Sequence, residues 1–273
     1  YALCKGQAWY MVGPTVKFIL DGKLRERVYP RDILHHIADR HGAFPGRNLE
    51  WDGEAVAAMP MQGRFTLATL SAELSCEFSL FRHDAVTAAY LDGRAAKPYE
   101  PVDPDPDADY EETIRIDVGA LEPLVVLPNK MAHNAKPARD LAGTRIDQAF
   151  IGSCANGRIE DFAVAADIMR GRQVAPGVRM IVTPGSQSVL REAMAKGYVD
   201  TLMAGGAVVT NSTCGACYGG HMGVLGDGEV CITASTRNFQ GRMGSPEAEI
   251  YLGSPATVAA SAITGTIADP REV

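Results

Sequence analysis

Two cysteines separated by two residues, Cys214 and Cys217, form the most chemically informative spacing in the chain. A Cys-x-x-Cys pair can bind zinc, hold an iron–sulfur cluster or carry out disulfide redox chemistry. Cys154 adds a third thiol in the turn Gly152-Ser153-Cys154. Three thiolates without a fourth favour a [4Fe–4S] cluster with one iron left open. Such an iron can act as a Lewis acid on a substrate hydroxyl group.

The other three cysteines are interpreted as structural. Cys231 could complete a four-cysteine zinc site, but it lies inside a strand-like run, Glu229 to Thr233. A buried cysteine in a strand behaves as a small apolar residue, and we extend this interpretation to Cys4 and Cys76. The zinc alternative remains open on the residues alone.

Strands and helices that alternate from Thr144 onward are expected to position these thiols. The pattern predicts strands at residues 146–151, 179–183 and 207–210, with helices beginning near Ile159 and Gln187. This order implies parallel pairing in an α/β layer, in which ligands bind beyond the carboxyl ends of strands. Cys154, Ser186 and Cys214 each follow a predicted strand, so we expect one pocket to gather them.

Composition narrows the classes of function. The net charge of −7 and the lack of a basic stripe argue against a nucleic-acid partner. No apolar run approaches the roughly 20 residues that span a bilayer, so no membrane partner is expected. The chain begins with Tyr1 and shows no signal peptide, which suggests a fragment or processed product in the cytoplasm. In that compartment, cysteines favour metal or redox chemistry over disulfides.

Two domains are expected, divided at residue 143. Residues 1–143 would form an α/β domain that is incomplete at its N-terminus, with a strand at Val16–Leu20 and helices at Asp32–His41 and Phe65–Leu74. Residues 93–112 are rich in Pro and Asp and predict a surface connection. Residues 144–273 would form the α/β domain that binds the cluster.

Three ordered motifs resemble those of the aconitase superfamily. The first cysteine lies in Phe150-Ile-Gly-Ser-Cys-Ala-Asn-Gly-Arg, and the cysteine pair precedes Gly219-Gly-His-Met-Gly. A closing block follows, with Arg237-Asn-Phe-Gln-Gly-Arg242 and Ser254-Pro-Ala. The first half resembles the family more weakly, through residues 49–56 and 64–67. The resemblance implies aconitase-like iron–sulfur domains: three-layer α/β/α architecture with mostly parallel sheets.

The resemblance also implies roles for particular residues. Cys154, Cys214 and Cys217 would ligate a [4Fe–4S] cluster, while Arg237 and Arg242 would bind substrate carboxylates. Arginine suits that task because its planar fork offers paired donors. Glu73, in a predicted helix, would approach the open iron and the substrate hydroxyl. Ser186 is a further candidate for substrate binding.

Within the superfamily, the chain looks most similar to the large subunit of enzymes that isomerise 2-isopropylmalate to 3-isopropylmalate in leucine biosynthesis. We therefore expect a [4Fe–4S]-dependent hydro-lyase that is inactive without an upstream segment and a small subunit carrying the swivelling domain. Alternatives are hydro-lyases acting on homocitrate, a methylated malate or citrate, and a non-catalytic cluster-binding module. Thr69 and Thr236 stand where the family usually has Asn, which leaves these alternatives open.

Overall fold

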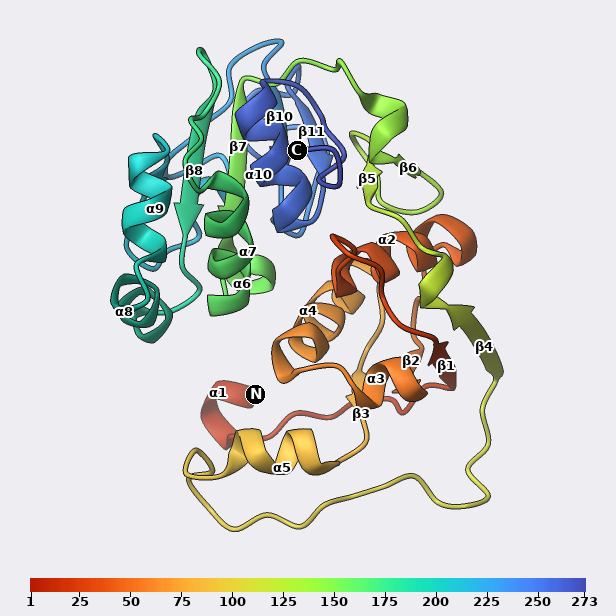
Figure 1. The fold of residues 1–273 in the computed structure, drawn as a ribbon. Helices are drawn as coiled ribbons and strands as arrows, with labels where there is room; N and C mark the ends of the chain where they lie inside the picture. The colour runs from red at the N-terminus through yellow and green to blue at the C-terminus, as the bar shows by residue number, and fades with distance from the viewer.

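A computed structural model describes residues 1–273 and shows two β-sheets joined through one helix-lined junction. The four-stranded sheet has the order β3-β2-β1-β4, and the seven-stranded sheet has the order β6-β5-β11-β10-β7-β8-β9. We call these parts the four-stranded unit and the seven-stranded unit. Figure 1 shows them stacked one above the other, with α2 at the junction.

The four-stranded sheet is entirely parallel. Its helices are connections between successive strands, as parallel pairing requires. Its strands are β1 (Thr15–Asp21), β2 (Asn48–Asp52), β3 (Ser79–Phe81) and β4 (Glu112–Asp117). The helices are α2 (Pro30–His41), α3 (Glu54–Ala57), α4 (Met61–Ser71) and α5 (Ala85–Leu91).

One face of this sheet carries its core. Alternate residues of β1, namely Val16, Phe18 and Leu20, are buried against apolar residues of α2 and α4. The opposite face is mostly polar, and there Lys17 Nζ lies 2.9 Å from Asp52 Oδ2 and 3.4 Å from Glu50 Oε1. This strict alternation is the expected pattern for a strand with one buried face.

The seven-stranded sheet is parallel except at one edge, where β5 and β6 run antiparallel. Its strands are β5 (Leu124–Val126), β6 (Ala135–Pro137), β7 (Gln148–Gly152), β8 (Arg179–Thr183), β9 (Val208–Val209), β10 (Val230–Thr233) and β11 (Glu249–Leu252). Its helices are α6 (Ser153–Asn156), α7 (Ile159–Met169), α8 (Gln187–Ala195), α9 (Tyr198–Ala204) and α10 (Pro255–Thr264). The predicted α/β class with mostly parallel sheets is confirmed.

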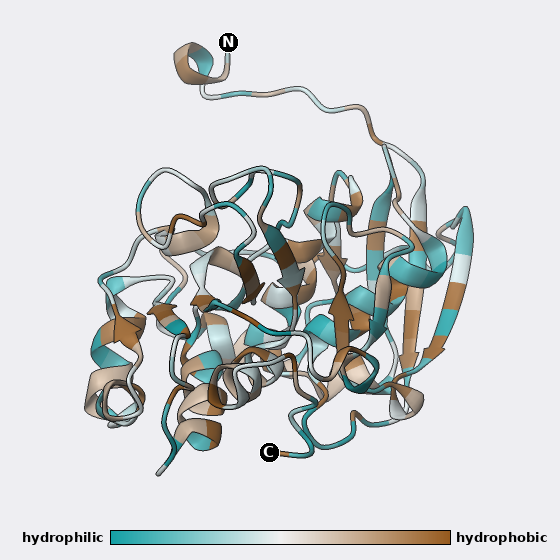
Figure 2. Cartoon of the chain, turned by 90° about the horizontal axis from the view of Figure 1, so that it is seen from above, coloured by the Kyte–Doolittle hydropathy of each residue, from teal (hydrophilic) through white to brown (hydrophobic).

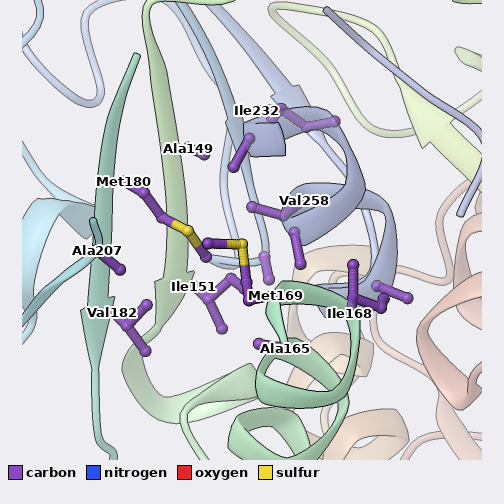
Figure 3. Packing of buried hydrophobic residues seen from close by; sticks show 14 of the residues in the cluster. Ala149, Ile151, Ala165, Ile168, Met169, Met180, Val182, Ala207, Ile232 and Val258 are labelled. Carbon is purple, nitrogen blue, oxygen red and sulfur yellow. The ribbon is translucent and has the colours of Figure 1, made fainter. Parts of the chain in front are cut away.

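The main core of this unit lies between the central strands and helices α7 and α10. Figure 3 shows Met180 and Ile151 from neighbouring strands meeting Met169 of α7 and Val258 of α10. A second cluster, which includes Phe150, Cys217 and Cys231, packs under the loops that follow η4, a 3₁₀ turn at Gly215–Cys217. Both faces of the seven-stranded sheet are therefore covered.

The strand pairing divides the chain earlier than expected. We predicted that residues 1–143 would form the first domain, yet β5 and β6 pair within the seven-stranded sheet. The 3₁₀ turns η2 (Val118–Ala120) and η3 (Ala138–Leu141) flank this edge hairpin. Both strands have only three residues, which is too short for periodicity to reveal them.

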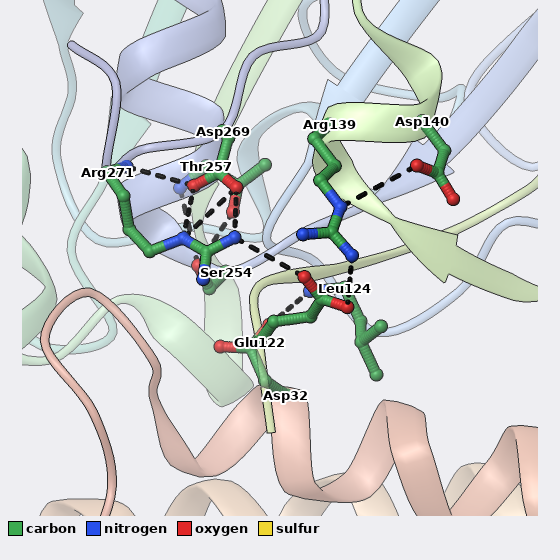
Figure 4. A network of polar contacts seen from close by, with 9 residues as sticks. All are labelled: Asp32, Glu122, Leu124, Arg139, Asp140, Ser254, Thr257, Asp269 and Arg271. Atoms are coloured by element: carbon green, nitrogen blue, oxygen red, sulfur yellow. Dashed lines mark hydrogen bonds and ion pairs between the residues drawn. The ribbon is translucent and has the colours of Figure 1, made fainter. Parts of the chain in front are cut away.

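Charged residues bind the C-terminus to the junction between the units (Figure 4). Arg271 pairs with buried Asp269 and, at 3.4 Å, with Glu122, which Arg139 also contacts at 3.2 Å. On the other side of the junction, the carboxylate of Asp32 in α2 accepts a hydrogen bond from the Leu124 backbone N–H at 2.9 Å. The first turn of α2 is thereby fixed against the edge of the seven-stranded sheet.

The N-terminal residues and the acidic connection lie at the periphery. Helix α1 (Ala2–Lys5) is set apart from the rest of the chain, and Trp9, Tyr10 and Met11 near it are exposed (Figure 2). Residues 93–111 form no helix or strand and run along the outside from α5 to β4 (Figure 1), as the composition predicted. None of the helices has the length and apolar character needed to cross a membrane.

Candidate functional site

The first cysteine lies in a strained turn at the carboxyl end of β7. Gly152 has φ 147°, and a Cβ on it would come within 2.3 Å of the Thr183 carbonyl oxygen in β8. Ser153 has a left-handed φ of 68°, an unfavourable conformation for a non-glycine residue, and its buried hydroxyl has no hydrogen-bond partner. Cys154 follows directly and is exposed. The strained turn therefore places the Cys154 thiol at the protein surface, at the carboxyl end of β7.

The cysteine pair packs against the ends of the same two strands. Cys214 precedes η4 and is exposed, whereas Cys217 ends η4 and is buried. Gly215 between them has φ 56°, and a Cβ there would lie 2.5 Å from Thr183 Oγ1 and 3.1 Å from the Phe150 ring. Only glycine fits this close approach, which places both cysteine motifs at the carboxyl ends of β7 and β8.

The closing block supports the cysteine pair directly. Arg242 Nε donates to the Cys217 carbonyl oxygen at 2.8 Å, and its Nη2 lies 3.7 Å from Cys217 Sγ. The backbone N–H of Gly219 donates to the Arg242 carbonyl oxygen at 2.9 Å. Arg242 thus contacts a predicted cluster ligand, a contact that its expected role in carboxylate binding did not include.

Arg237 lies close to the two cysteine motifs. The hydrogen bond with Glu73 is the main cause that raises the pKa of Arg237, and negative charge on Cys217 and Cys154 adds to it. Arg237 Nε lies 2.9 and 2.8 Å from the two carboxylate oxygens of Glu73. Two predicted site residues from different units are therefore in contact.

Glu73 is not in a regular α-helix as predicted. Helix α4 ends at Ser71, and Glu73 lies in the 3₁₀ turn η1 (Ala72–Leu74). Ser75, the first residue after η1, has φ 62°, so the chain turns away there. The tighter turn sets the direction of the Glu73 side chain toward Arg237.

Ser186 follows β8 but has a local structural role. Its hydroxyl accepts a hydrogen bond from the Val189 N–H at 3.2 Å and thereby caps α8. The preceding residue, Gly185, donates its N–H to the Gly157 carbonyl oxygen at 2.7 Å, which joins this loop to the Cys154 loop. Substrate binding by Ser186 stays a prediction.

Cys231 and Cys76 lie outside this group. Cys231 is fully buried in β10, and burial raises the pKa of its thiol to about 12. Burial likewise raises the pKa of Cys76 to about 12. Both thiols are held in their neutral form, in which sulfur is a poor metal ligand. Their burial favours the structural interpretation made from the sequence; Cys4 is exposed in the N-terminal segment.

The candidate donors are cysteine thiols, the ligands that an iron–sulfur cluster takes. No group of three or more His, Cys, Asp or Glu side chains converges as one ion would require. A cubane makes a different demand, because each thiolate binds a different iron. The chain offers three such thiols: Cys154 and Cys214 are exposed, and Cys217 lies in η4. The positive charge of Arg237 lies nearby.

Sequence reasoning missed two arginines that contact the site loops. Arg158 donates to the Cys154 carbonyl oxygen at 3.1 Å and stacks over the Phe65 ring at 4.8 Å. Arg31 in α2 is fully buried and contacts Asn156. Both line a cavity of about 730 Å³ between the units, which none of the three predicted ligands lines. Nothing in the helical pattern marked Arg31, because its partners lie far along the sequence.

The chain is similar to proteins of a known family. The model of the aconitase family (aconitate hydratase) matches residues 2–135 and 128–265. The 3-isopropylmalate dehydratase large subunit of Mycolicibacterium smegmatis is 51% identical over 99% of this chain and 64% of its own length. The protein of the same name from Nitratiruptor sp. is 44% identical over 100% of this chain and 66% of its own length. The chain thus spans about two thirds of these relatives.

A solved structure, the holo-form of Thermococcus kodakaraensis aconitase X, matches 83% of this chain and 49% of its own, with a TM-score of 0.43 and 15% identity. That likeness is too low to support an argument. The match to the family model covers nearly the whole chain and includes all three cysteine positions and the closing block. The chain therefore belongs to the aconitase family.

Proposed function

We propose that this chain is part of a hydro-lyase that isomerises 2-isopropylmalate to 3-isopropylmalate by removing and re-adding water. The observation that carries the proposal is the convergence of both cysteine motifs at the ends of β7 and β8, with Arg237 and Arg242 beside them. Relatives named 3-isopropylmalate dehydratase large subunit, at 51% and 44% identity, support the choice of substrate.

In this proposal, Cys154, Cys214 and Cys217 hold a [4Fe–4S] cluster. When bound, the cluster supplies an open iron that acts as a Lewis acid toward the substrate hydroxyl. Arg237 and Arg242 orient the dicarboxylate through charge-assisted hydrogen bonds. Glu73 lies against Arg237 and is placed to hold or release a proton near the same substrate end.

The name of the relatives, large subunit, favours a partner: a small subunit with a swivelling domain. We infer that this partner and the remaining third of the relatives' length supply the base that removes the carbon-bound proton. Acid and base groups typically contribute about 10²–10⁴-fold each, so the 273-residue chain alone should show no turnover. A cytoplasmic location and a place in leucine biosynthesis belong to the same proposal.

The test begins with anaerobic reconstitution and analysis of iron, sulfide and zinc. We expect about four irons per chain and matching inorganic sulfide. The complete, partnered protein should then convert 2-isopropylmalate, and homocitrate, citrate and a methylated malate serve as competing substrates. Stoichiometric zinc without sulfide would refute the cluster. A bound cluster without conversion of any of these acids would instead favour a non-catalytic cluster-binding module.

A further inference from the structure

The guanidinium of Arg31 connects the four-stranded unit to both loops of the candidate site. Its Nη1 donates to Asn156 Oδ1 at 2.8 Å and to the Ala234 carbonyl oxygen at 2.6 Å, and its Nη2 donates to the Ser235 carbonyl oxygen. Asn156 stands two residues after Cys154, and Ser235 stands two residues before Arg237. One side chain therefore contacts the loop of a predicted ligand and the loop of a predicted substrate arginine.

The burial of this charge is costly and needs compensation. Arg31 is fully buried, and its three contacts are an amide and two backbone carbonyls, not a carboxylate. Burial lowers the pKa of Arg31 to about 10, so the side chain remains protonated at neutral pH. The acidic groups that oppose this lowering when they are ionised are Asp32, Asp161, Cys217 and Glu73. Two of these four belong to the candidate site.

We propose that Arg31 is a positioning residue and fixed positive charge for the cluster site, a role that rests on the proposed cluster. The planar guanidinium of Arg31 fixes the distance between the Cys154 loop and the Arg237 loop. It does so because acceptors from both loops bind the same rigid group. Its charge offsets the negative charge of a cluster held by thiolates. The positioning effect acts through other residues and the charge acts through space, since the hydrogen bonds of Arg31 go to Asn156, Ala234 and Ser235.

Two substitutions separate these effects. Arg31→Lys keeps a positive charge but cannot span three acceptors, and Arg31→Met removes the charge and the donors at similar length. Arg27→Met is the matched control. Arg27 Nη1 pairs with Asp167 Oδ2 at 3.0 Å, so it also joins the two units, but it contacts neither site loop.

The experiment uses the whole protein and three measurements. In the cluster-free protein, hydrogen exchange of peptides covering residues 153–158 and 234–237 should be faster in both Arg31 variants than in Arg27→Met. After reconstitution, iron retention against a chelator should weaken roughly 10- to 100-fold, the range for residues that orient metal ligands without binding the metal. The reduction potential of the retained cluster should fall in Arg31→Met and stay near the unmodified value in Arg31→Lys, since nearby charge tunes such potentials.

The outcomes distinguish this inference from the proposed function. If the unmodified protein takes up no iron and sulfide, the proposed function fails, while hydrogen exchange still decides whether Arg31 positions the loops. If the cluster forms and both Arg31 variants match Arg27→Met in exchange, retention and potential, only the inference fails. Should Arg31→Met not fold, Arg31→Lys together with Asn156→Ala, which removes one acceptor, tests positioning through the same exchange and retention measurements.

Discussion

The two carboxylate oxygens of Glu73 lie 2.9 and 2.8 Å from Arg237 Nε, across the junction of the two units. The guanidinium expected to bind a substrate carboxylate thus already holds a carboxylate of the protein. Glu73 is largely shielded, with 15% of its side chain exposed, whereas Arg237 is 47% exposed. A substrate must therefore share or displace this internal partner.

Glu73→Gln tests whether this pair serves catalysis or stability. The arginine is well exposed, so loss of the pair should change the free energy of unfolding by only about 0.2–1 kcal/mol. Turnover by the complete, partnered enzyme should fall about 10²–10⁴-fold if the carboxylate handles a proton. Thermal unfolding and kcat are measured on the same preparations. Glu77→Gln, an exposed glutamate nearby, is the control, and equal kcat in both variants would remove Glu73 from the mechanism.

The cysteines should divide into two classes. Cys154→Ser, Cys214→Ser and Cys217→Ser should each abolish cluster retention, measured as iron and sulfide per chain. Cys231→Ser should retain the cluster but lower the free energy of unfolding by about 1–3 kcal/mol, because it places a hydroxyl in a fully buried strand position. Cys76→Ser should also retain it. Loss of cluster in Cys231→Ser with retention in Cys154→Ser would reverse the ligand assignment.

Arg242→Lys should impair both the cluster site and substrate binding. Lysine keeps the charge but loses the fork that reaches the Cys217 carbonyl oxygen at 2.8 Å and its sulfur at 3.7 Å. We expect kcat/KM to fall by a factor equivalent to about 2 kcal/mol at equal cluster content, a typical value for a charge-assisted hydrogen bond.

Arg191→Lys, on the exposed side of α8, is the control for this measurement. Arg158→Lys would be unsuitable as a control, because Arg158 donates to the Cys154 carbonyl oxygen. An Arg242→Lys enzyme with the kcat/KM of the control would leave Arg242 without a role in substrate binding.

The ion pair between Arg64 and Asp84 should affect how the free energy of unfolding depends on pH under acidic conditions. Hydrogen bonds from Arg64 lower the pKa of Asp84 from 3.8 to about 2. Between these values the unfolded chain binds more protons, so stability is full above about pH 4 and is lost as the pH falls toward 2.

Asp84→Asn, which can still cap α5, should flatten this pH dependence of the free energy of unfolding. Denaturant titrations at a series of pH values provide the measurement, and Asp107→Asn in the exposed connection is the control. An unchanged slope in Asp84→Asn would show that the pair does not survive in solution.

Local pattern was sufficient to predict the elements that carry the cysteines. Strand β8 has the predicted bounds, α7 begins at the predicted Ile159, and β10 buries Cys231 as its apolar run indicated. These features follow from periodicity and turn chemistry within a few residues. Contacts between distant segments could not be predicted in this way: the edge strands β5 and β6, the Glu73–Arg237 pair and the three acceptors of Arg31 all depend on which loops the fold brings together.

Strand β10 lies between β7 and β11 in the sheet but follows both cysteine motifs in the sequence. During synthesis, Cys154 therefore emerges before the strand that pairs with its own, and Arg242, which holds Cys217, emerges later still. The three thiols cannot reach their final arrangement until β10 and Arg242 have left the ribosome. Non-local strand pairing of this kind forms late. If the chain holds the proposed cluster, iron and sulfur would have to be delivered after translation of this region, and the two exposed cysteines are open to oxidation until then.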